Sequence, residues 1–369
     1  MARVMNFGAG PGALPLQVLE EVREELLDVR GTGMSILEHS HRGKTYSAIH
    51  EEAKAALRRL TALPDSHEIL FLQGGASAQF AEVPLNWLGH GQRAGFVING
   101  VWGEKAYEEA ARVVGLGGGE AFVAATSREG ETYRRAVTSV ALEGPTPAYM
   151  HYTSNETIHG IQYDLPDGVP MPRVEGIPAV GDLSSDFLWK PCDLSAYAFA
   201  YAGAQKNVGP SGLVVAVAEK EFLARCRKDL PKIFRYDIQA KNDSLYNTPP
   251  TLSVEITRRV LCWLERGGGL AAIEQQNLQK GRALYAALDG TFYRCPVETN
   301  VRSVMNAVFR LPSEELEARF VAEAKAEGLE GLKGHRSVGG IRVSMYNAVP
   351  LAWVRVLADF MGTFARKNG

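Results

Sequence analysis

The chain has 369 residues, enough for a large core in two structural lobes and too few for many independent modules. Apolar residues make up 46% and charged residues 22%, near the averages of globular proteins, which excludes a disordered or fibrous protein. The formal net charge is −2 and no dense basic run occurs, so we expect no nucleic-acid partner.

No stretch approaches the roughly 20 apolar residues of a membrane-spanning helix, and the first twelve residues lack a signal-peptide core. We therefore expect a cytoplasmic protein with no membrane partner. The four cysteines form neither C-x-x-C pairs nor a Cys/His cluster, so we expect them to be reduced and to form no metal site. They are Cys192, Cys226, Cys262 and Cys295.

Apolar spacing predicts an amphipathic helix after Pro15 and a second helix through Ile49 to Leu60. Short apolar runs that then alternate with helical stretches favour an α/β fold with a largely parallel sheet. The strands are expected at 68–72, 96–98, 148–152, 177–180, 197–201 and 213–217, and the helices between them include 104–114 and 219–227.

A run of three glycines at 267–269 marks a change of rhythm. Beyond it we expect helix 278–288, strand 305–311, helix 313–327, strand 340–345 and helix 350–366. The predicted organisation is a large domain over 16–266 and a smaller α+β domain made of 1–15 and 267–369. A second glycine run, 117–119, is interpreted as a turn.

The most informative segment is Tyr201–Gly212, in which Lys206 stands among small residues after an apolar strand. Open α/β sheets bind ligands at the carboxyl ends of their strands, and a lysine that is partly removed from water loses its charge readily, as a Schiff-base amine must. A solvated loop lysine is the alternative. Asp182 ends the preceding apolar run, where a carboxylate can keep a ring nitrogen protonated or simply cap a turn.

Three further features suit an anionic, aromatic ligand. Gly74-Gly75 ends one strand, and the helix start that follows, with Ala76 and Ser77, suits a phosphate, although this is also ordinary connection chemistry. Trp102 follows the next strand and can stack on a ring or lie in the core. Two His-Arg pairs and a nearby arginine suit a multiply charged anion, although exposed arginines usually bind nothing. These residues are His41, Arg42, His335, Arg336 and Arg342.

Together these segments resemble the phosphoserine aminotransferases, which are class V members of the pyridoxal-phosphate aminotransferases. The matching segments cover nearly the whole chain. They begin at Asn6 (NFGAGP), Ser40 (SHRGK), Gln73 (QGGAS), His151 (HYTSNET), Tyr201 (YAGAQKN), Tyr246 (YNTPP), Lys333 (KGHR) and Tyr346 (YNA). The resemblance implies the aminotransferase fold of type I, pyridoxal phosphate as cofactor, and a homodimer.

The resemblance also implies residue roles. Lys206 would hold the cofactor as a Schiff base, Asp182 would pair with the pyridine nitrogen, and Trp102 would cover the ring. Thr153 would contact the region of the ring hydroxyl. The cofactor phosphate would be held by Ala76, Ser77 and Gln205, and by Asn247 and Thr248 of the partner subunit.

For the substrate, Arg342 would take the α-carboxylate. The phosphate of phosphoserine, or the side-chain carboxylate of glutamate, would be received by His41, Arg42, His335 and Arg336. Some members carry Gly-Arg where this chain has Ala76-Ser77, which leaves anion recognition more dependent on the His-Arg pairs.

The function implied is reversible amino transfer between L-glutamate and 3-phosphohydroxypyruvate, giving O-phospho-L-serine and 2-oxoglutarate in serine biosynthesis. The alternatives are another class V enzyme, such as a serine–glyoxylate aminotransferase, or a non-catalytic phosphometabolite-binding module. A cysteine desulfurase fits poorly, because no cysteine lies in an evident catalytic loop.

Overall fold

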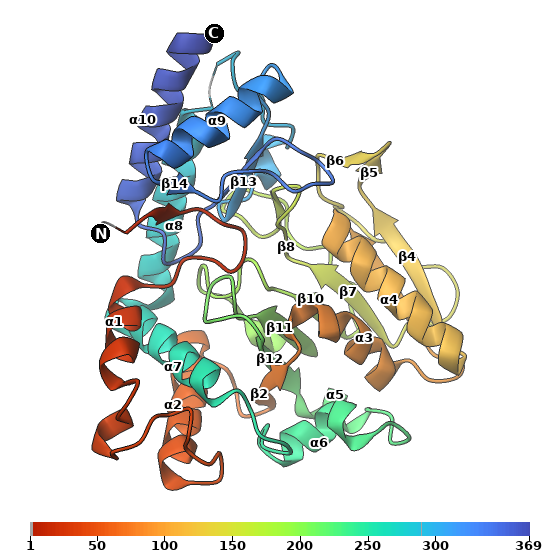
Figure 1. Ribbon diagram of the computed structural model, residues 1–369. Helices are drawn as coiled ribbons and strands as arrows, with labels where there is room; N and C mark the ends of the chain where they lie inside the picture. The colour runs from red at the N-terminus through yellow and green to blue at the C-terminus, as the bar shows by residue number, and fades with distance from the viewer. Residues whose placement is uncertain (1–2, 289) are drawn as a thin grey trace.

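A computed structural model describes residues 3–288 and 290–369. Its central feature is a seven-stranded sheet in the order β2-β12-β11-β10-β7-β3-β4 (Figure 1). The strands are β2 (His67–Gln73), β3 (Arg93–Ile98), β4 (Glu120–Thr126), β7 (Tyr149–Thr153), β10 (Ala179–Asp182), β11 (Phe199–Gly203) and β12 (Leu213–Glu219). All neighbours are parallel except at β12, which runs antiparallel to both β11 and β2. The predicted α/β architecture with a largely parallel sheet is confirmed.

The middle of the sheet is covered on both faces. Every residue of β7, β10 and β11 is buried, which explains why these strands appear in the sequence as continuous apolar runs. Helix α3 (Gly75–Trp87) contacts β11 and β12, and α4 (Val101–Gly117) contacts β3, β4 and β7. Each helix begins within three residues of the strand before it, α3 after β2 and α4 after β3, so their first turns lie at the carboxyl ends of those strands.

Other elements complete this large lobe. Helices α2 (Lys44–Thr61) and α7 (Thr251–Arg266) pack against each other, and His50 of α2 meets the ring of Phe71 in β2 edge-on at 5.2 Å. The remaining elements are α1 (Leu16–Glu25), α5 (Lys220–Ala224), α6 (Tyr236–Lys241), and two short hairpins, β5 (Arg128–Glu129) with β6 (Thr132–Tyr133) and β8 (Asn155–Glu156) with β9 (Ile161–Gln162).

A second apolar core lies in the upper part of Figure 1. Its elements are α8 (Gly269–Ala286), α9 (Glu314–Ala326), α10 (Leu351–Asn368), the antiparallel pair β13 (Asn306–Phe309) and β15 (Ile341–Ser344), and the parallel pair β1 (Met5–Asn6) and β14 (Leu329–Glu330). Phe7 and Ala13 join this core, so the N-terminal segment packs with the C-terminal third. The domain limits at 15/16 and 266/267 stay a prediction, and residues 1, 2 and 289 lie outside the described chain.

One predicted helix needs corrected bounds, and some elements have no counterpart in the prediction. The helix expected at 278–288 spans Gly269–Ala286 and starts at the last glycine of the run, because Gly268 and Gly269 take positive φ values of 97° and 74° and turn the chain between α7 and α8. Helix α7 and strand β4 were not predicted. The glycines at 117–119 do form a turn, with Gly118 in the left-handed conformation that ends α4.

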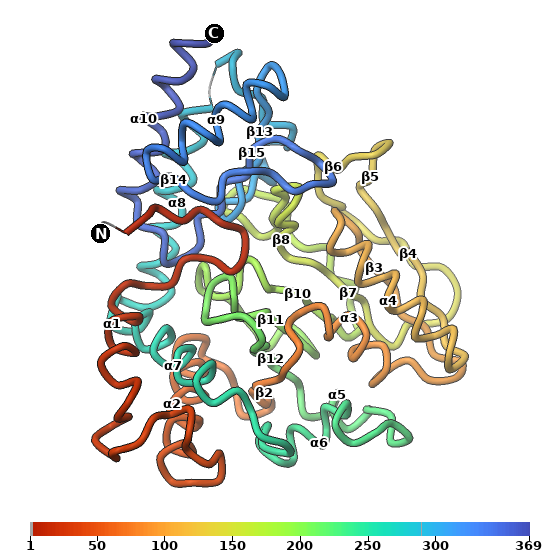
Figure 2. The backbone as a smooth tube through the Cα atoms, in the orientation of Figure 1, coloured from red at the N-terminus to blue at the C-terminus, as the bar shows by residue number. Residues whose placement is uncertain are grey.

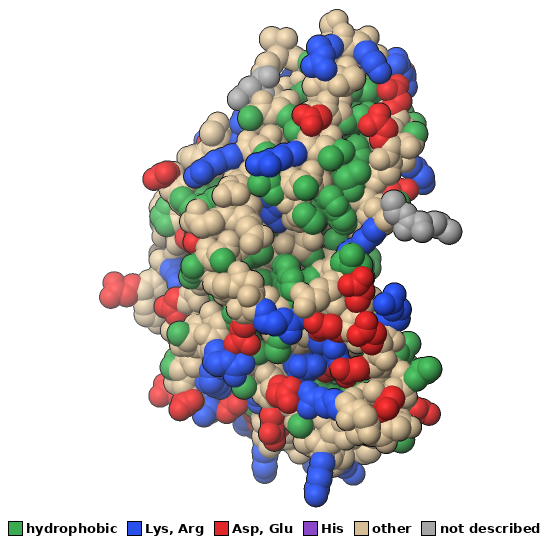
Figure 3. Space-filling model, turned by 90° about the vertical axis from the view of Figure 1, so that its left-hand side faces the viewer, with side chains coloured by type: hydrophobic (Ala, Val, Ile, Leu, Met, Phe, Trp, Pro, Cys, Tyr) green, Lys and Arg blue, Asp and Glu red, His purple; other side chains and the backbone are tan. Residues whose placement is uncertain are grey.

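The surface over α1, α2 and α7 carries closely mixed charges (Figure 3). Its ion pairs include Arg30–Glu52, Arg59–Glu265 and Arg266–Glu21. The blue and red side chains therefore alternate on this face and form no single-sign patch. No helix within the described residues is both long enough and apolar enough to cross a membrane.

Candidate active site

The candidate site lies at the carboxyl ends of three neighbouring parallel strands. Parallel register places Asp182, the last residue of β10, beside Thr153 of β7 and Tyr201 of β11. Lys206 follows β11 by three residues. Residues that are 20 to 50 positions apart in the sequence therefore meet at one edge of the sheet, where open α/β sheets bind their ligands.

The Lys206 amine is held inside this edge. Its Nζ donates to Thr157 Oγ1 at 2.9 Å and lies 5.3 Å from the centre of the Trp102 ring. Burial lowers the pKa of Lys206 to about 8, against the opposing charges of Asp182 and Glu156, and with Arg342 lowering it further. The amine is therefore neutral in a large fraction of molecules near pH 8, as a nucleophilic amine requires.

The Asp182 carboxylate is oriented by a short turn. Its Oδ1 accepts the Ser184 N–H at 2.9 Å and the Ser184 hydroxyl at 2.5 Å, and that hydroxyl accepts the Gly203 N–H at 3.0 Å. Burial raises the pKa of Asp182, while the bonds from Ser184 and the charge of Lys206 lower it. One carboxylate oxygen is thus fixed by the protein, and no described side chain hydrogen-bonds the other.

The first turn of α3 provides backbone donors for an anion. Gly74 and Gly75 take positive φ values of 90° and 69°, so the chain can turn sharply from β2 into the helix. Ala76 and Ser77 follow in the first turn, whose N–H groups have no partner within the helix. The side-chain oxygen of Gln205 is buried without a hydrogen-bond partner among the described residues.

Several other buried polar atoms also lack a partner within the described chain. They are Thr153 Oγ1, Trp102 Nε1, His151 Nδ1 and Arg342 Nε. Such atoms are rare in folded proteins because leaving them unpaired costs free energy. Trp102 and Arg342 lie near Lys206, and Thr153 lies beside Asp182, so these unpaired atoms fit a polar, aromatic ligand such as pyridoxal phosphate.

Cationic side chains reach the site from the small lobe. Arg342 lies in β15, and burial lowers its pKa. The loop between β14 and β15 carries His335 and Arg336, and the His335 ring bonds Ser337 Oγ at 2.7 Å. Burial, then the charges of Arg342, Lys105 and Arg336, lower the pKa of His335. Arg342 acts on the pKa values of both Lys206 and His335, so these groups share one electrostatic neighbourhood.

The other His-Arg pair lies elsewhere in the chain. His41 and Arg42 precede α2, in the red segment at the lower left of Figure 2, whereas the blue loop with His335 and Arg336 lies in the upper half. His41 Nε2 is buried without a partner among the described residues. The fold of one chain therefore does not bring the two His-Arg pairs together.

Asn247 and Thr248 lie beside the glycine turn of their own chain. The Gln73 side chain donates to the Thr248 carbonyl at 3.2 Å. Asn247, Gln73 and Gly74 line a cavity of about 230 Å³. These contacts place the two residues at the β2 end of the sheet edge.

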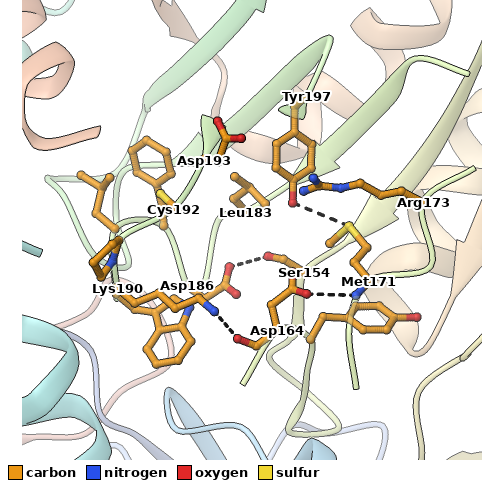
Figure 4. A pocket seen from close by; sticks show the side chains of 15 residues that line it. Ser154, Asp164, Met171, Arg173, Leu183, Asp186, Lys190, Cys192, Asp193 and Tyr197 are labelled. Atoms are coloured by element: carbon orange, nitrogen blue, oxygen red, sulfur yellow. Dashed lines mark hydrogen bonds between the residues drawn. The ribbon is translucent and has the colours of Figure 1, made fainter. Parts of the chain in front are cut away.

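A larger cavity of about 380 Å³ is lined by Ser154, Leu183 and Asp186, among others, and by neither Asp182 nor Lys206 (Figure 4). In the figure the Ser154 hydroxyl points at Asp186, to which it donates a hydrogen bond, and Gln162 bonds the other carboxylate oxygen at 3.3 Å. Burial raises the pKa of Asp186 to about 7. This cavity is therefore a neighbour of the site and not the site itself.

Two residues at the site were not assigned roles from the sequence. Thr157 accepts from Lys206, and Glu156 accepts the backbone N–H groups of Trp102 and Gly103 at 3.0 and 2.8 Å. The available signal is the run His151–Thr157, which ends strand β7 and continues beyond it, and which is used in the sequence analysis only as part of the resemblance.

The fold and this lysine-centred site define a class of enzyme, the aminotransferases that use pyridoxal phosphate. The sequence matches the family Aminotransferase class-V over residues 4–357, so the chain belongs to that family. It is a transaminase, and its cofactor is pyridoxal phosphate.

Within the class, the similar proteins are phosphoserine aminotransferases. That of Niallia circulans is 46% identical over all of this chain and 99% of its own length, and that of Geobacillus kaustophilus is 47% identical over 100% and 99%. The solved structure of the enzyme from Bacillus circulans subsp. alkalophilus superposes with a TM-score of 0.94 at 46% identity, covering 100% of this chain and 99% of the other.

A pyridoxal-phosphate-bound phosphoserine aminotransferase from Trichomonas vaginalis superposes with a TM-score of 0.88 at 35% identity, covering 97% and 99%. An alanine–glyoxylate aminotransferase from Nostoc, at 16% identity and a TM-score of 0.76, shares the fold alone.

Proposed function

We propose that this enzyme moves an amino group reversibly between L-glutamate and 3-phosphohydroxypyruvate, giving O-phospho-L-serine and 2-oxoglutarate in serine biosynthesis. The observation that carries the proposal is the meeting of a half-buried lysine, a buried strand-end aspartate and a half-buried arginine within one site. The full-length similarity to phosphoserine aminotransferases supports this choice of substrates.

The cofactor contacts are those that the resemblance to the phosphoserine aminotransferases implies, and the positions of the residues support them. Asp182 would keep the pyridine nitrogen protonated, Trp102 would cover the ring, and Thr153 would contact the region of the ring hydroxyl. Ala76, Ser77 and Gln205 hold the phosphate, the first two through the first turn of α3. When bound, the cofactor supplies an electron sink for the electrons left at the substrate Cα.

Lys206 is assigned two roles. Its amine would be the group that holds the cofactor as a Schiff base, and it would also be the base placed to take the proton from the substrate Cα. The lowered pKa suits this second role, because a base works best when its pKa lies near the working pH. Thr157 accepts a hydrogen bond from the amine and so holds it in position for both roles.

The cationic residues are assigned to the substrate. Arg342 grips the α-carboxylate that all amino-acid substrates share, and a guanidinium can do so with two parallel hydrogen bonds. His335 and Arg336 receive the second anion, which is phosphate in phosphoserine and a carboxylate in glutamate. Ala76-Ser77 offers no cation of its own at the helix start, so this second anion depends on the His-Arg pairs.

The working form is proposed to be a homodimer in the cytoplasm. Segments near His41 and near Asn247 expose large apolar side chains, including Leu27 at 83%, Leu37 at 62% and Phe234 at 42%. A two-fold interface would bury such side chains and would deliver His41, Arg42, Asn247 and Thr248 to the partner's site. All four cysteines are free, as in a reducing compartment.

A panel of amino donors assayed with 3-phosphohydroxypyruvate tests the reaction. Glutamate should be the preferred donor, and in the reverse direction phosphoserine should exceed serine in kcat/KM by a wide margin. Borohydride reduction followed by peptide mapping should label Lys206. Label on another lysine, or an equal preference for serine with glyoxylate as acceptor, would point to a different class V reaction.

A further inference from the structure

Glu156 is a fully buried carboxylate that no cation neutralises directly. It lies in β8, and none of its hydrogen bonds or ion pairs within the described chain involves a Lys or Arg side chain. Its Oε2 accepts the Trp102 N–H at 3.0 Å and its Oε1 accepts the Gly103 N–H at 2.8 Å. Both carboxylate oxygens are thus used on two consecutive backbone groups.

Those two groups belong to the first turn of α4. The residue before this helix is Gly100, which has no side chain to cap it. The unpaired N–H groups at a helix start carry partial positive charge, so a carboxylate there is stabilised. Glu156 supplies this cap from more than 50 residues away in the chain.

The glycine makes room for this arrangement. A Cβ added at Gly100 would lie 2.5 Å from Glu156 Oε2, closer than real contacts allow. The Gly100 φ of 170° is ordinary extended backbone, so backbone strain does not require glycine there. Glycine is required there because the Glu156 carboxylate approaches so closely.

Glu156 is linked to Lys206 through two residues, Trp102 and Thr157. Trp102, whose N–H Glu156 holds, has its ring 5.3 Å from Lys206 Nζ. Thr157, the next residue after Glu156, accepts from that same Nζ at 2.9 Å. Residues 156 and 157 therefore form one short segment that fixes the indole from one side and the amine from the other.

We propose that Glu156 is a positioning residue that fixes the backbone of Trp102, and thereby the indole against the cofactor ring and Lys206. The inference rests on the proposed role of Trp102 as the residue that covers the ring. Glu156 touches neither substrate nor cofactor in this arrangement, and acts through Trp102 and Thr157.

The test compares Glu156→Gln with Glu104→Gln in the holoenzyme. Glu104 also lies in the first turn of α4 but bonds Arg128 and Tyr133, so its change removes a charge from the same helix end and leaves Trp102 held. In Glu156→Gln the amide keeps only one acceptor, so the Trp102 and Gly103 amides should exchange hydrogen faster. The visible circular dichroism of the bound cofactor should weaken, and kcat should fall about 10- to 100-fold with little change in KM.

Gly100→Ala provides a second route to the same disturbance. It leaves Glu156 in place but pushes its carboxylate away, so it should reproduce faster exchange at residues 102 and 103 and the weaker dichroism. Wild-type exchange and dichroism in both variants would overturn the inference. Trp102→Phe distinguishes a failure of the proposed function from a failure of this inference. If the dichroism and turnover of Trp102→Phe are those of the wild type, Trp102 does not cover the cofactor ring. Hydrogen exchange at residues 102 and 103 in the Glu156 and Gly100 variants still decides whether Glu156 holds this backbone.

Discussion

Two aspartates in this chain make the same local turn. Asp182 and Asp193 each begin an Asp-Leu-Ser sequence, and each accepts the N–H and the hydroxyl of the serine two residues on. The distances are 2.9 and 2.5 Å at Asp182, and 3.0 and 2.5 Å at Asp193. What separates them is position, because Asp182 is buried at a strand end beside Lys206 whereas Asp193 precedes a surface turn.

This pair allows a matched test of Asp182. Asp182→Asn should still fold and bind cofactor, because an amide oxygen can accept the same bonds from Ser184. It should lower kcat on the order of 10²–10³-fold, because a neutral amide does not hold the ring proton and one preorganised electrostatic contact is lost. Steady-state kinetics with glutamate measures the loss. Asp193→Asn should leave kcat unchanged, and equal kinetics in the two variants would reduce Asp182 to a turn cap.

At this scale the sequence predicts which residues lie together where each residue stands near the end of its own strand. Lys206 and Asp182 were singled out because each follows an apolar run, and the parallel register brings them to one edge. Glu156 was missed because its acceptors, the amides of Trp102 and Gly103, belong to a helix far away in the chain. No local pattern marks a cap of that kind, since it arises from tertiary packing.

Helix α8 joins the two cores and carries an unusual buried cation. Its first turns give Leu270 and Ile273 to the large core, and its last turn gives Leu284 to the small one. Between them Lys280 is 1% exposed and donates to the carbonyls of Met345 and Tyr346, both at 2.9 Å. These carbonyls follow β15, so one ammonium ties the strand that carries Arg342 to the connecting helix.

Lys280 should give the protein a measurable pH dependence of stability. Burial lowers the pKa of Lys280 in the folded protein to about 7, below the ordinary value of 10.5. Between these two pH values the Lys280 amine is protonated in the unfolded chain and mostly neutral in the folded one. The free energy of unfolding, measured relative to Lys280→Met, should therefore rise with pH across that window and be lowest below pH 7. Urea unfolding of both proteins at several pH values measures the difference.

The exposed Lys325, whose side chain is 67% accessible, serves as the comparison for that experiment. Lys325→Met should give a difference from the wild type that stays flat over the same pH range. A flat difference for Lys280→Met as well would mean that its ammonium keeps an ordinary pKa despite burial.

Strand direction shows where sequence reasoning at the element scale stops. The expected strand at 213–217 is present as β12, but it inserts antiparallel between β2 and β11. Its connection from β11 is short, at 204–212, and a parallel crossover needs about a dozen residues or more. That length was available in the sequence, whereas the pairing of β12 with β2, about 140 residues away, follows only from the assembled sheet.

At the scale of the whole molecule, one chain holds an incomplete set of the proposed site residues. Lys206, Asp182, Trp102 and Arg342 come together, while the segment before α2 that carries the other His-Arg pair lies in the lower half of Figure 2, away from the loop between β14 and β15. If both His-Arg pairs serve one anion, the second pair must come from another copy. A two-fold interface satisfies this at both sites at once.

Mixing inactive variants tests that sharing directly. Lys206→Ala homodimers and Arg42→Ala homodimers should each be nearly inactive, and so should Asn247→Ala if its side chain reaches the partner's cofactor phosphate. In a mixed dimer the Arg42→Ala subunit keeps its own Lys206 and receives Arg42 from the Lys206→Ala subunit. Random exchange of subunits should therefore restore about a quarter of the wild-type activity, since half the dimers are mixed and each has one intact site.

The control for this experiment uses two residues that lie together in one chain. Lys206→Ala mixed with Asp182→Asn leaves one lesion in each site of every mixed dimer, so activity should not return. Recovery in the first mixture and not in the second requires Arg42 to act across the interface. No recovery in either mixture, or full activity in a protein that sediments as a monomer, would place Arg42 in the site of its own chain. A conformational change would then be needed to bring the two His-Arg pairs of one chain together.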